Sequence, residues 1–302
     1  MSIPRRVLGR TGEEVSILCL GGWHIRSIQD DNEAIRIMHT AIGEGLTFFD
    51  NAWDYHWGAS EELMGRALQG RRNDVFLMTK NCERDYEGSK RCLEDSLRRL
   101  NTDRIDLWQF HELIYDNDPD WIYERGGLRA ALEAQKEGKV RFLGFTGHKH
   151  PSIHLDMLSR SDDWDATLVP INVMDSGYRS FIKQLIPAAE AKNVAVLGMK
   201  GIGGGAVTGK LVADAGLDAA ECYRYCLSQR IASQVVGISS MEQLMFDIDV
   251  ARSPLMSEEE QAEFVARVRD VAGDGRFETF KSTNMHDGPH HRQQHGFALA
   301  AS

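Results

Sequence analysis

The chain alternates between short apolar runs and longer segments with helical spacing of apolar positions. Continuous apolar runs of this length are typical of strands buried on both faces of a parallel sheet. Eight such runs predict strands at 16–21, 46–50, 75–80, 105–111, 140–145, 166–172, 194–199 and 234–239. The helical patterns that follow them lie at 31–44, 60–69, 89–100, 127–137, 152–158, 181–192, 218–230 and 241–251.

Eight β/α pairs in about 240 residues are the number and length of a (β/α)8 barrel, an α/β fold. A doubly wound sheet is the competing architecture, and it favours G-x-G-x-x-G after the first strand. The chain has Leu20-Gly21-Gly22-Trp23-His24 there, which does not fit. We therefore predict a barrel domain over 1–272, preceded by a hairpin at 6–15 and closed by an extra helix at 257–271.

Residues 273–302 form a predicted polar tail that packs on the barrel, and its last part carries His286, His290, His291 and His295. Metal binding is one interpretation of such a tract. A solvated segment over the surface or mouth of the barrel is the other, and we favour it because the spacing matches no standard ligand pattern. We predict no metal ligands in this chain.

Composition narrows the class of protein further. The formal net charge is −10, from 45 acidic and 35 basic residues, and no long basic stretch indicates nucleic-acid binding. Five cysteines, an odd number, favour reduced thiols and a cytoplasmic location. Cys222 and Cys226 lie one helical turn apart, but no second ligand pair accompanies them. We find neither a signal peptide nor an apolar run of roughly 18 residues, so we expect no membrane partner. The oligomeric state stays open.

Four polar residues lie at or just past the ends of three consecutive predicted strands. Asp50 and Tyr55 follow the second strand, Lys80 closes the third and His111 closes the fourth. In a parallel β/α barrel the carboxyl ends of the strands share one mouth, where active sites lie. An acid, a phenol, an amine and an imidazole that meet there make a proton-transfer site.

These four residues, together with Gly-Ala-Ser-Glu-Glu-Leu-Met-Gly-Arg-Ala-Leu at 58–68, resemble the aldo-keto reductase superfamily. The resemblance covers about residues 7–252. It implies a (β/α)8 barrel that reduces a carbonyl to an alcohol with NADPH, or less often NADH.

The resemblance also implies a role for each catalytic residue. Tyr55 is the general acid, Lys80 lowers its pKa, Asp50 anchors the lysine, and His111 orients the carbonyl or relays a proton. A phenol has a pKa near 10, so it donates poorly at pH 7 unless its anion is stabilised. The predicted substrate-binding residues are His111, Trp23, Trp53 and Trp57, whose indoles would exclude water.

The nicotinamide pocket departs from the family pattern. Asn172 matches the family residue that grips the carboxamide, and Thr146 can replace a serine hydroxyl. Gly147 stands where the family has asparagine, Leu168 where glutamine is often seen, and Met199 where a tyrosine usually stacks on the ring. We expect fewer carboxamide contacts as a result.

Two segments suit the phosphates of the cofactor. Lys200-Gly201-Ile202-Gly203-Gly204-Gly205 offers bare backbone amides and a lysine. Residues 236–247 resemble the adenosine-phosphate segment of the family, but they lack the arginine that often clamps a 2′-phosphate. We predict NADPH, with NADH possible. The predicted cofactor-binding residues are Gly22, Trp23, Asp50, Thr146, Gly147, Asn172, Met199, Lys200, Gly201, Gly203, Gly237, Ser239, Ser240, Gln243 and Asp247.

The expected activity is therefore reduction of a small aldehyde or ketone by a nicotinamide-dependent enzyme. The alternative is a cofactor-binding sensor or accessory subunit on the same fold with little turnover, which the altered pocket and the polar tail suggest. A metal-dependent barrel hydrolase is a third hypothesis, and Lys80 and the phosphate segments count against it. The physiological substrate depends on the loop at 116–126 and on the tail.

Overall fold

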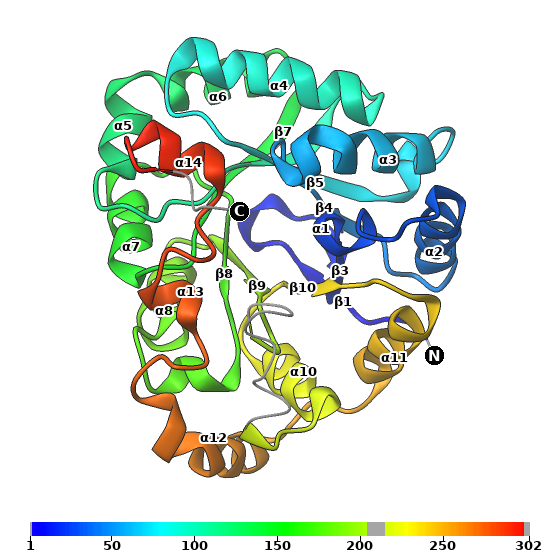
Figure 1. Cartoon of the computed structure of the whole chain (residues 1–302), viewed down its shortest axis with the longest axis vertical. Helices are drawn as coiled ribbons and strands as arrows, with labels where there is room; N and C mark the ends of the chain where they lie inside the picture. The colour runs from blue at the N-terminus through cyan, green and yellow to red at the C-terminus, as the bar shows by residue number, and fades with distance from the viewer. Residues whose placement is uncertain (1, 204–214, 299–302) are drawn as a thin grey trace.

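The computed structural model describes residues 2–203 and 215–298, and its centre is a closed barrel of parallel strands (Figure 1). The strands pair in the order β10-β3-β4-β5-β6-β7-β8-β9. They are β3 (Leu18–Gly21), β4 (Phe48–Asp50), β5 (Phe76–Asn81), β6 (Ile105–Phe110), β7 (Val140–Thr146), β8 (Ala166–Pro170), β9 (Ala195–Met199) and β10 (Ser233–Gly237). The predicted (β/α)8 barrel is confirmed.

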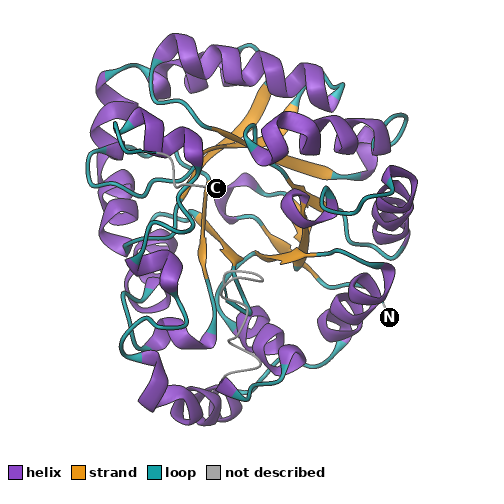
Figure 2. Ribbon diagram, in the orientation of Figure 1, coloured by secondary structure: helices purple, strands orange, loops and turns teal. Residues whose placement is uncertain are grey.

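Helices surround the barrel on all sides in the view down its axis (Figure 2). They are α1 (Gly22–Ile25), α2 (Asp31–Gly43), α3 (Ala59–Ala67), α4 (Tyr86–Leu100), α5 (Asp118–Glu124), α6 (Gly127–Lys136), α7 (Pro151–Arg160), α8 (Phe181–Ala191), α10 (Ala219–Ser228), α11 (Met241–Arg252) and α12 (Glu258–Ala272). Short 3-10 turns are η1 (Gly9–Thr11), η2 (Tyr55–Gly58), η3 (Arg72–Asp74) and η4 (Val173–Ser176).

The apolar residues divide according to the faces of the strands. Inward-facing side chains fill the barrel, with Phe48 packing edge-on against Phe76 at 5.2 Å between ring centroids. Outward-facing side chains form two larger clusters against the surrounding helices. Because both faces are covered, the strands are apolar without alternation, which is the pattern that identified them in the sequence.

The hairpin of β1 (Arg5–Val7) and β2 (Glu14–Ser16) covers the amino-terminal end of the barrel. Leu8 and Val15 reach the cluster that fills the barrel interior. Gly9 has a φ of +52°, and a Cβ there would lie 2.7 Å from the amide nitrogen of Ala195. Any larger residue at position 9 would therefore push the hairpin off the start of β9.

The segment expected as an open loop at 116–126 contains a helix, α5. Its 7 residues are too few for an amphipathic pattern to stand out in the sequence. The fold holds the segment by a buried ion pair, in which Arg84 Nε lies 2.9 Å from Asp118 Oδ1. Asp118 Oδ2 also accepts hydrogen bonds from the amides of Ile114 and Tyr115. Among the described residues, no helix is both long and apolar enough to cross a bilayer.

The C-terminal tail folds back over the barrel as two short helices, α13 (Thr279–Ser282) and α14 (Pro289–Gln294), drawn in red-orange and red in Figure 1. Lys281 fastens it. The Nζ atom of Lys281 lies 2.7 Å from Asp175 Oδ1, 2.9 Å from Glu278 Oε2 and 2.8 Å from the carbonyl oxygen of Tyr178. All three charged side chains are buried, so the tail is fastened at its start to the loop after β8.

Candidate active site

The four predicted catalytic residues meet at the carboxyl ends of β4, β5 and β6. Lys80 Nζ lies 2.6 Å from Asp50 Oδ1 and 2.6 Å from the carbonyl oxygen of Asn51. It also donates to the hydroxyl of Tyr55 over 3.2 Å. The rings of Tyr55 and His111 pack edge-on at 5.6 Å. The strand register brings this about, because β4, β5 and β6 are consecutive parallel neighbours.

Burial sets the protonation states at this site. It raises the pKa of Tyr55 well above its usual value, and the carboxylates of Asp50 and Asp54 add to the effect. Lys80 lies 3.2 Å from the Tyr55 hydroxyl, where its ammonium favours the phenolate, but burial and the neighbouring carboxylates keep the net pKa of Tyr55 above its usual value. Burial also raises the pKa of Asp50, which Lys80 opposes, and lowers the pKa of His111. Tyr55 is therefore a protonated phenol and His111 a neutral imidazole at pH 7.

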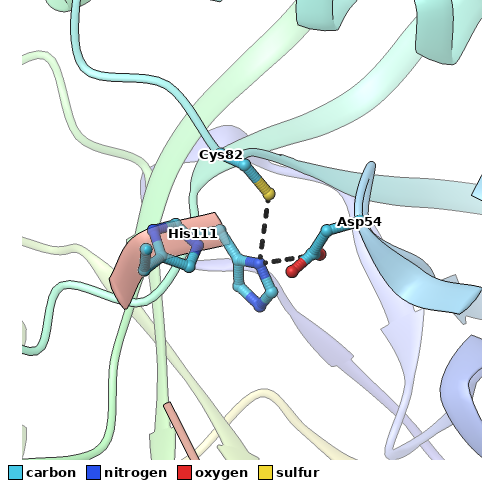
Figure 3. Close-up of side chains that lie close together, drawn as sticks. Asp54, Cys82 and His111 are labelled. Carbon is cyan, nitrogen blue, oxygen red and sulfur yellow. Dashed lines mark hydrogen bonds and ion pairs between the residues drawn. The ribbon is translucent and has the colours of Figure 1, made fainter. Parts of the chain in front are cut away.

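One nitrogen of His111 points towards two further polar groups, Asp54 and Cys82 (Figure 3). His111 Nδ1 lies 3.2 Å from Asp54 Oδ1 and 3.5 Å from Cys82 Sγ. Burial opposes the charge of Asp54, but the contact with His111 outweighs it and holds the pKa of Asp54 below its usual value. The sequence analysis missed both neighbours, although Asp54 directly precedes Tyr55 and Cys82 follows Lys80 by two positions.

The tail brings a third group to His111. His291, on α14, packs edge-on against His111 with ring centroids 5.4 Å apart. Nearby, Glu112 Oε2 accepts a hydrogen bond of 2.8 Å from the amide of Gly288. Burial, with the charge of Asp54, raises the pKa of Glu112 to about 8. We had grouped His291 only with the other tail histidines, since nothing in the sequence pairs it with His111.

The three predicted tryptophans differ in their surroundings. Trp23 is about half exposed and packs edge-on against Tyr55 at 5.3 Å. Trp57 is 83% exposed, in a backbone conformation with φ of +58°. Trp53 packs edge-on against His290 of the tail at 5.3 Å, and its Nε1 donates to Asp95 Oδ2 of α4 over 3.3 Å. Trp23 therefore contacts the proposed proton donor, whereas Trp53 lies between α4 and the tail.

The predicted nicotinamide contacts have other partners in this structure. Thr146 donates its hydroxyl to the carbonyl oxygen of Leu168 over 2.7 Å. Asn172 is fully buried: its Oδ1 accepts from the amides that start η4, and its Nδ2 donates to Glu278 Oε1 over 3.0 Å. Gly147 is packed so closely that a Cβ would lie 2.3 Å from the carbonyl oxygen of Leu113. A carboxamide therefore competes with the tail for Asn172.

Two more predicted residues lie at the end of β9. Met199 ends β9 and packs against the interior cluster. Lys200 adopts a φ of +56°, and its ammonium lies 5.2 Å from the centroid of the Phe280 ring on α13. Burial lowers the pKa of Lys200 to about 8. Gly201 and Gly203 form an isolated bridge after it, whereas Gly204 and Gly205 of the predicted phosphate loop lie outside the described residues.

The start of α11 presents polar groups to solvent. Ser240 caps the helix by accepting from the amide of Gln243 over 3.1 Å. Gln243 Oε1 in turn accepts from both the amide and the hydroxyl of Ser239. Gly237 lies against the ring of His24, where a Cβ would approach within 2.4 Å. Exposed amides at a helix N-terminus suit an anion such as phosphate.

Asp247 is the clearest sign of a missing partner in this region. It is 1% exposed, and neither of its carboxylate oxygens has a hydrogen-bond partner among the described residues. Burial raises its pKa to about 8. A buried carboxyl group without a partner is costly, so a ligand that hydrogen-bonds to it would be stabilised.

Gly22, at the start of α1, packs tightly against Asp50, at the end of β4. A Cβ on Gly22 would lie 2.8 Å from the carbonyl oxygen of Asp50. Ser60, in the first turn of α3, donates its hydroxyl to the carbonyl oxygen of Gly22 over 2.8 Å. These contacts fix the loop that carries Trp23 beside Tyr55.

The barrel and the tyrosine–lysine–aspartate–histidine cluster at its mouth define the class of protein: a barrel oxidoreductase. The model of the Aldo/keto reductase family matches residues 17–221, and the chain belongs to this family, whose members are NAD(P)-dependent oxidoreductases.

Curated relatives and solved structures agree. An uncharacterized oxidoreductase of Bacillus subtilis, YqkF, is 26% identical over 299 residues, which cover 85% of this chain and 94% of the relative. L-galactose dehydrogenase of Arabidopsis thaliana is 30% identical over 158 residues, 48% of this chain and 49% of the relative. The holo form of an aldo-keto reductase from Bacillus halodurans has a TM-score of 0.74 at 25% identity and covers 88% of this chain and 96% of its own.

Proposed function

We propose that the protein reduces a small aldehyde or ketone to an alcohol, with hydride from NADPH or NADH and a proton from Tyr55. The observation that carries this proposal is the position of Lys80 Nζ, 2.6 Å from Asp50 and 3.2 Å from the Tyr55 hydroxyl. A proton donor must lose its proton during turnover, and a fixed ammonium beside the phenol stabilises the anion that forms.

The bound nicotinamide would supply the hydride that attacks the carbonyl carbon. The chain itself supplies the proton and holds the carbonyl oxygen. Because burial keeps Tyr55 protonated, the phenol already carries the proton that it donates when the substrate binds. When the oxygen gains negative charge, Tyr55 transfers its proton to it, and Lys80 then stabilises the phenolate. Solvent reprotonates the phenolate before the next cycle.

His111 would position the oxygen. Its Nδ1 faces Asp54 and Cys82, so Nε2 is the ring nitrogen available to the substrate. A neutral imidazole can exchange a hydrogen bond there without adding a full charge beside Lys80. Trp23, packed against Tyr55, would cover the apolar part of the substrate and exclude water.

The residues present fit a nicotinamide dinucleotide at its adenosine end. Asp247, Ser239, Ser240 and the exposed amides of α11 would hold the adenosine and its phosphate. The first turns of α11, from Met241 to Asp247, contain no basic residue. We therefore infer that both NADPH and NADH serve as hydride donors. A structurally similar aldo/keto reductase from Klebsiella pneumoniae was solved with NADP, which agrees with the use of NADPH.

The experiment that tests the proposal measures oxidation of NADPH and of NADH with a panel of aldehydes and ketones, including 4-nitrobenzaldehyde and methylglyoxal. Tyr55→Phe removes the hydroxyl and little else. We expect it to lower kcat by at least about 100-fold, the usual contribution of a general acid, and to leave the cofactor Kd within about threefold.

Tyr123→Phe is the matched control, because Tyr123 lies on α5 in the outer layer and hydrogen-bonds Met157 and Trp164. It should retain wild-type kcat. Full activity in Tyr55→Phe would refute the role of the tyrosine. Tight binding of cofactor with no turnover on any carbonyl would refute the enzymatic proposal and favour a cofactor-binding sensor.

A further inference from the structure

We propose that Asp54, Cys82, His111 and His291 form a binding site for a zinc ion, beside the proton-transfer cluster and partly built by the tail. One potential ligand atom from each of the four residues lies within 4.8 Å of the others. Two histidines, a thiol and a carboxylate are the ligand types that zinc prefers in proteins.

The distances agree with tetrahedral zinc. With bond lengths of about 2.0–2.2 Å to nitrogen and oxygen and about 2.3 Å to sulfur, tetrahedral angles place nitrogen and oxygen roughly 3.3 Å apart and nitrogen and sulfur roughly 3.6 Å apart. The structure has 3.2 Å between His111 Nδ1 and Asp54 Oδ1, and 3.5 Å between His111 Nδ1 and Cys82 Sγ. The two distances from His111 Nδ1 thus match the spacing that the ion requires, and the other ligand atoms lie within 4.8 Å of one another (Figure 3).

A carboxylate and a thiol both converge on His111 Nδ1. The imidazole N–H and the thiol S–H can both donate towards the Asp54 carboxylate. Among the described residues, however, the buried Asp54 Oδ1 has no well-aligned hydrogen-bond donor. A metal ion that takes a lone pair from each of these atoms would satisfy this oxygen as well.

His291 provides the second, independent indication of a ligand. Its side chain is 1% exposed, and its Nε2 has no hydrogen-bond partner among the described residues. Nδ1 lies 3.5 Å from Arg84 Nη2, and Nε2 lies 3.6 Å from Glu112 Oε2. Both distances are at or beyond the limit of a hydrogen bond, so the imidazole is buried without a strong polar partner.

The charges balance. A thiolate and a carboxylate carry two negative charges and the two imidazoles none, so the ligand set neutralises a divalent cation. The thiol proton of Cys82 passes to solvent as the metal–ligand bonds form, whereas the single proton of the neutral His111 moves to Nε2 so that Nδ1 can bind the metal. Arg84, whose Nη2 lies 3.5 Å from His291 Nδ1, is itself paired with Asp118 at 2.9 Å, which limits its repulsion of the metal.

Metal binding would connect two parts of the molecule that turnover uses. His291 belongs to the tail, whereas the other three ligands follow β4, β5 and β6. The ion would therefore clamp α14 to the mouth. It would also hold the single proton of His111 on Nε2, the nitrogen that faces the substrate in the proposed reaction.

The test uses full-length protein freed of metal by chelator and titrated with Zn²⁺ and Co²⁺. We expect one equivalent of each to bind. The cobalt form should show the intense visible bands of a tetrahedral site and a sulfur-to-cobalt charge-transfer band. His291→Asn and Cys82→Ser should each weaken binding by at least about tenfold, since even groups that only support a metal ligand typically contribute that much.

The chain offers a matched control for each variant. His290→Asn alters the adjacent tail histidine, which pairs with Glu83, and Cys222→Ser alters a buried cysteine on α10. Both should bind zinc like the wild type. Failure of the wild type to bind one equivalent, a cobalt spectrum without the sulfur band, or equal weakening by His290→Asn would each overturn the proposal. The cobalt spectrum of the wild type decides the matter even where a variant does not fold, and binding is measured without turnover.

Discussion

Lys80 carries a positive charge at a position where 1% of its surface reaches solvent. Such a charge is tolerated only where anions and carbonyl oxygens replace water. Asp50 and the carbonyl oxygen of Asn51 do so here, each at 2.6 Å. The same contacts aim the ammonium at Tyr55, so stability and proton transfer depend on one carboxylate.

The Asp50→Asn substitution is expected to reduce both the stability of the fold and the rate of proton transfer. The amide leaves the Lys80 ammonium buried without a counter-charge, which typically costs about 3–5 kcal/mol in the free energy of unfolding. Urea denaturation measures this loss, and steady-state kinetics should show a lower kcat. Lys192→Ala is the control, because Lys192 pairs with Asp162 on the surface and such pairs contribute about 0–1 kcal/mol. Equal stability of the Asp50→Asn variant and the wild type would contradict the argument.

Asp247 shows the opposite situation, a buried carboxyl group without a partner. Its pKa is raised to about 8 in the folded chain, against about 3.9 in an unfolded chain. Below pH 4 both states hold the proton. Between pH 4 and 8 the folded state holds the proton and the unfolded state has lost it. Because the folded state binds more protons there, the free energy of unfolding falls as the pH rises.

Asp247→Asn should therefore stabilise the cofactor-free protein, and more at pH 8 than at pH 5. The gain at pH 8 is up to about 5 kcal/mol, from roughly four units at 1.36 kcal/mol each. Urea denaturation at the two pH values measures it. Asp249→Asn, an exposed change on the same helix, should shift stability equally little at both. A gain that does not grow with pH would argue against the burial of a protonated carboxyl group.

At the scale of elements, the tail is fastened by a buried charge network in addition to the buried ring of Phe280. Lys281 bridges Glu278 on the tail and Asp175 in η4. Asp175 also accepts from the amides of Phe181 and Ile182, so the same carboxylate caps α8. Burial and the charge of Asp175 raise the pKa of Glu278 to about 7, although Lys281 opposes this. The anchor therefore joins α13, η4 and α8 into one unit.

Lys281→Met should release the tail. Two buried carboxyl groups would lose their shared cation, with an expected loss of about 3–5 kcal/mol. Limited proteolysis followed by mass spectrometry should find faster cleavage within residues 273–298. Lys183→Met is the comparison, since Lys183 is exposed on α8 and contacts only a carbonyl oxygen among the described residues. Cleavage at the wild-type rate in Lys281→Met would show that other contacts hold the tail.

The elements that could be predicted are those whose apolar pattern determines them. The barrel strands each have two covered faces, and Asp50, Lys80 and His111 interrupt apolar runs where those strands end. Helix α5 could not be found, because its 7 residues are too few to show a helical period, although Ile122 packs into the core and Asp118 pairs with Arg84. The position of the Trp53 ring depends on Asp95 of α4 and on His290 of the tail, which no local pattern reveals.

At the scale of the whole molecule, the site joins segments that are far apart in sequence. Strand register places Tyr55, Lys80 and His111 together, and a sequence pattern can predict that much. The approach of His291 to Arg84, 207 positions away, depends on the path of the tail. That path is set by Lys281 and by the bond from Gly288 to Glu112, and neither leaves a periodic pattern in the sequence.

The buried anchor also determines when the mouth can be completed as the chain is made. Asp175 leaves the ribosome 106 residues before Lys281. At about 5–20 residues per second, that separation is about 5–20 s of synthesis. Six strands of the barrel precede Asp175 and the other two are made during this interval, so all eight exist before their covering segment does. Until Lys281 emerges, Asp175 binds the start of α8. The nascent barrel is therefore open over the catalytic residues, and its closure is one of the last events in the formation of the protein.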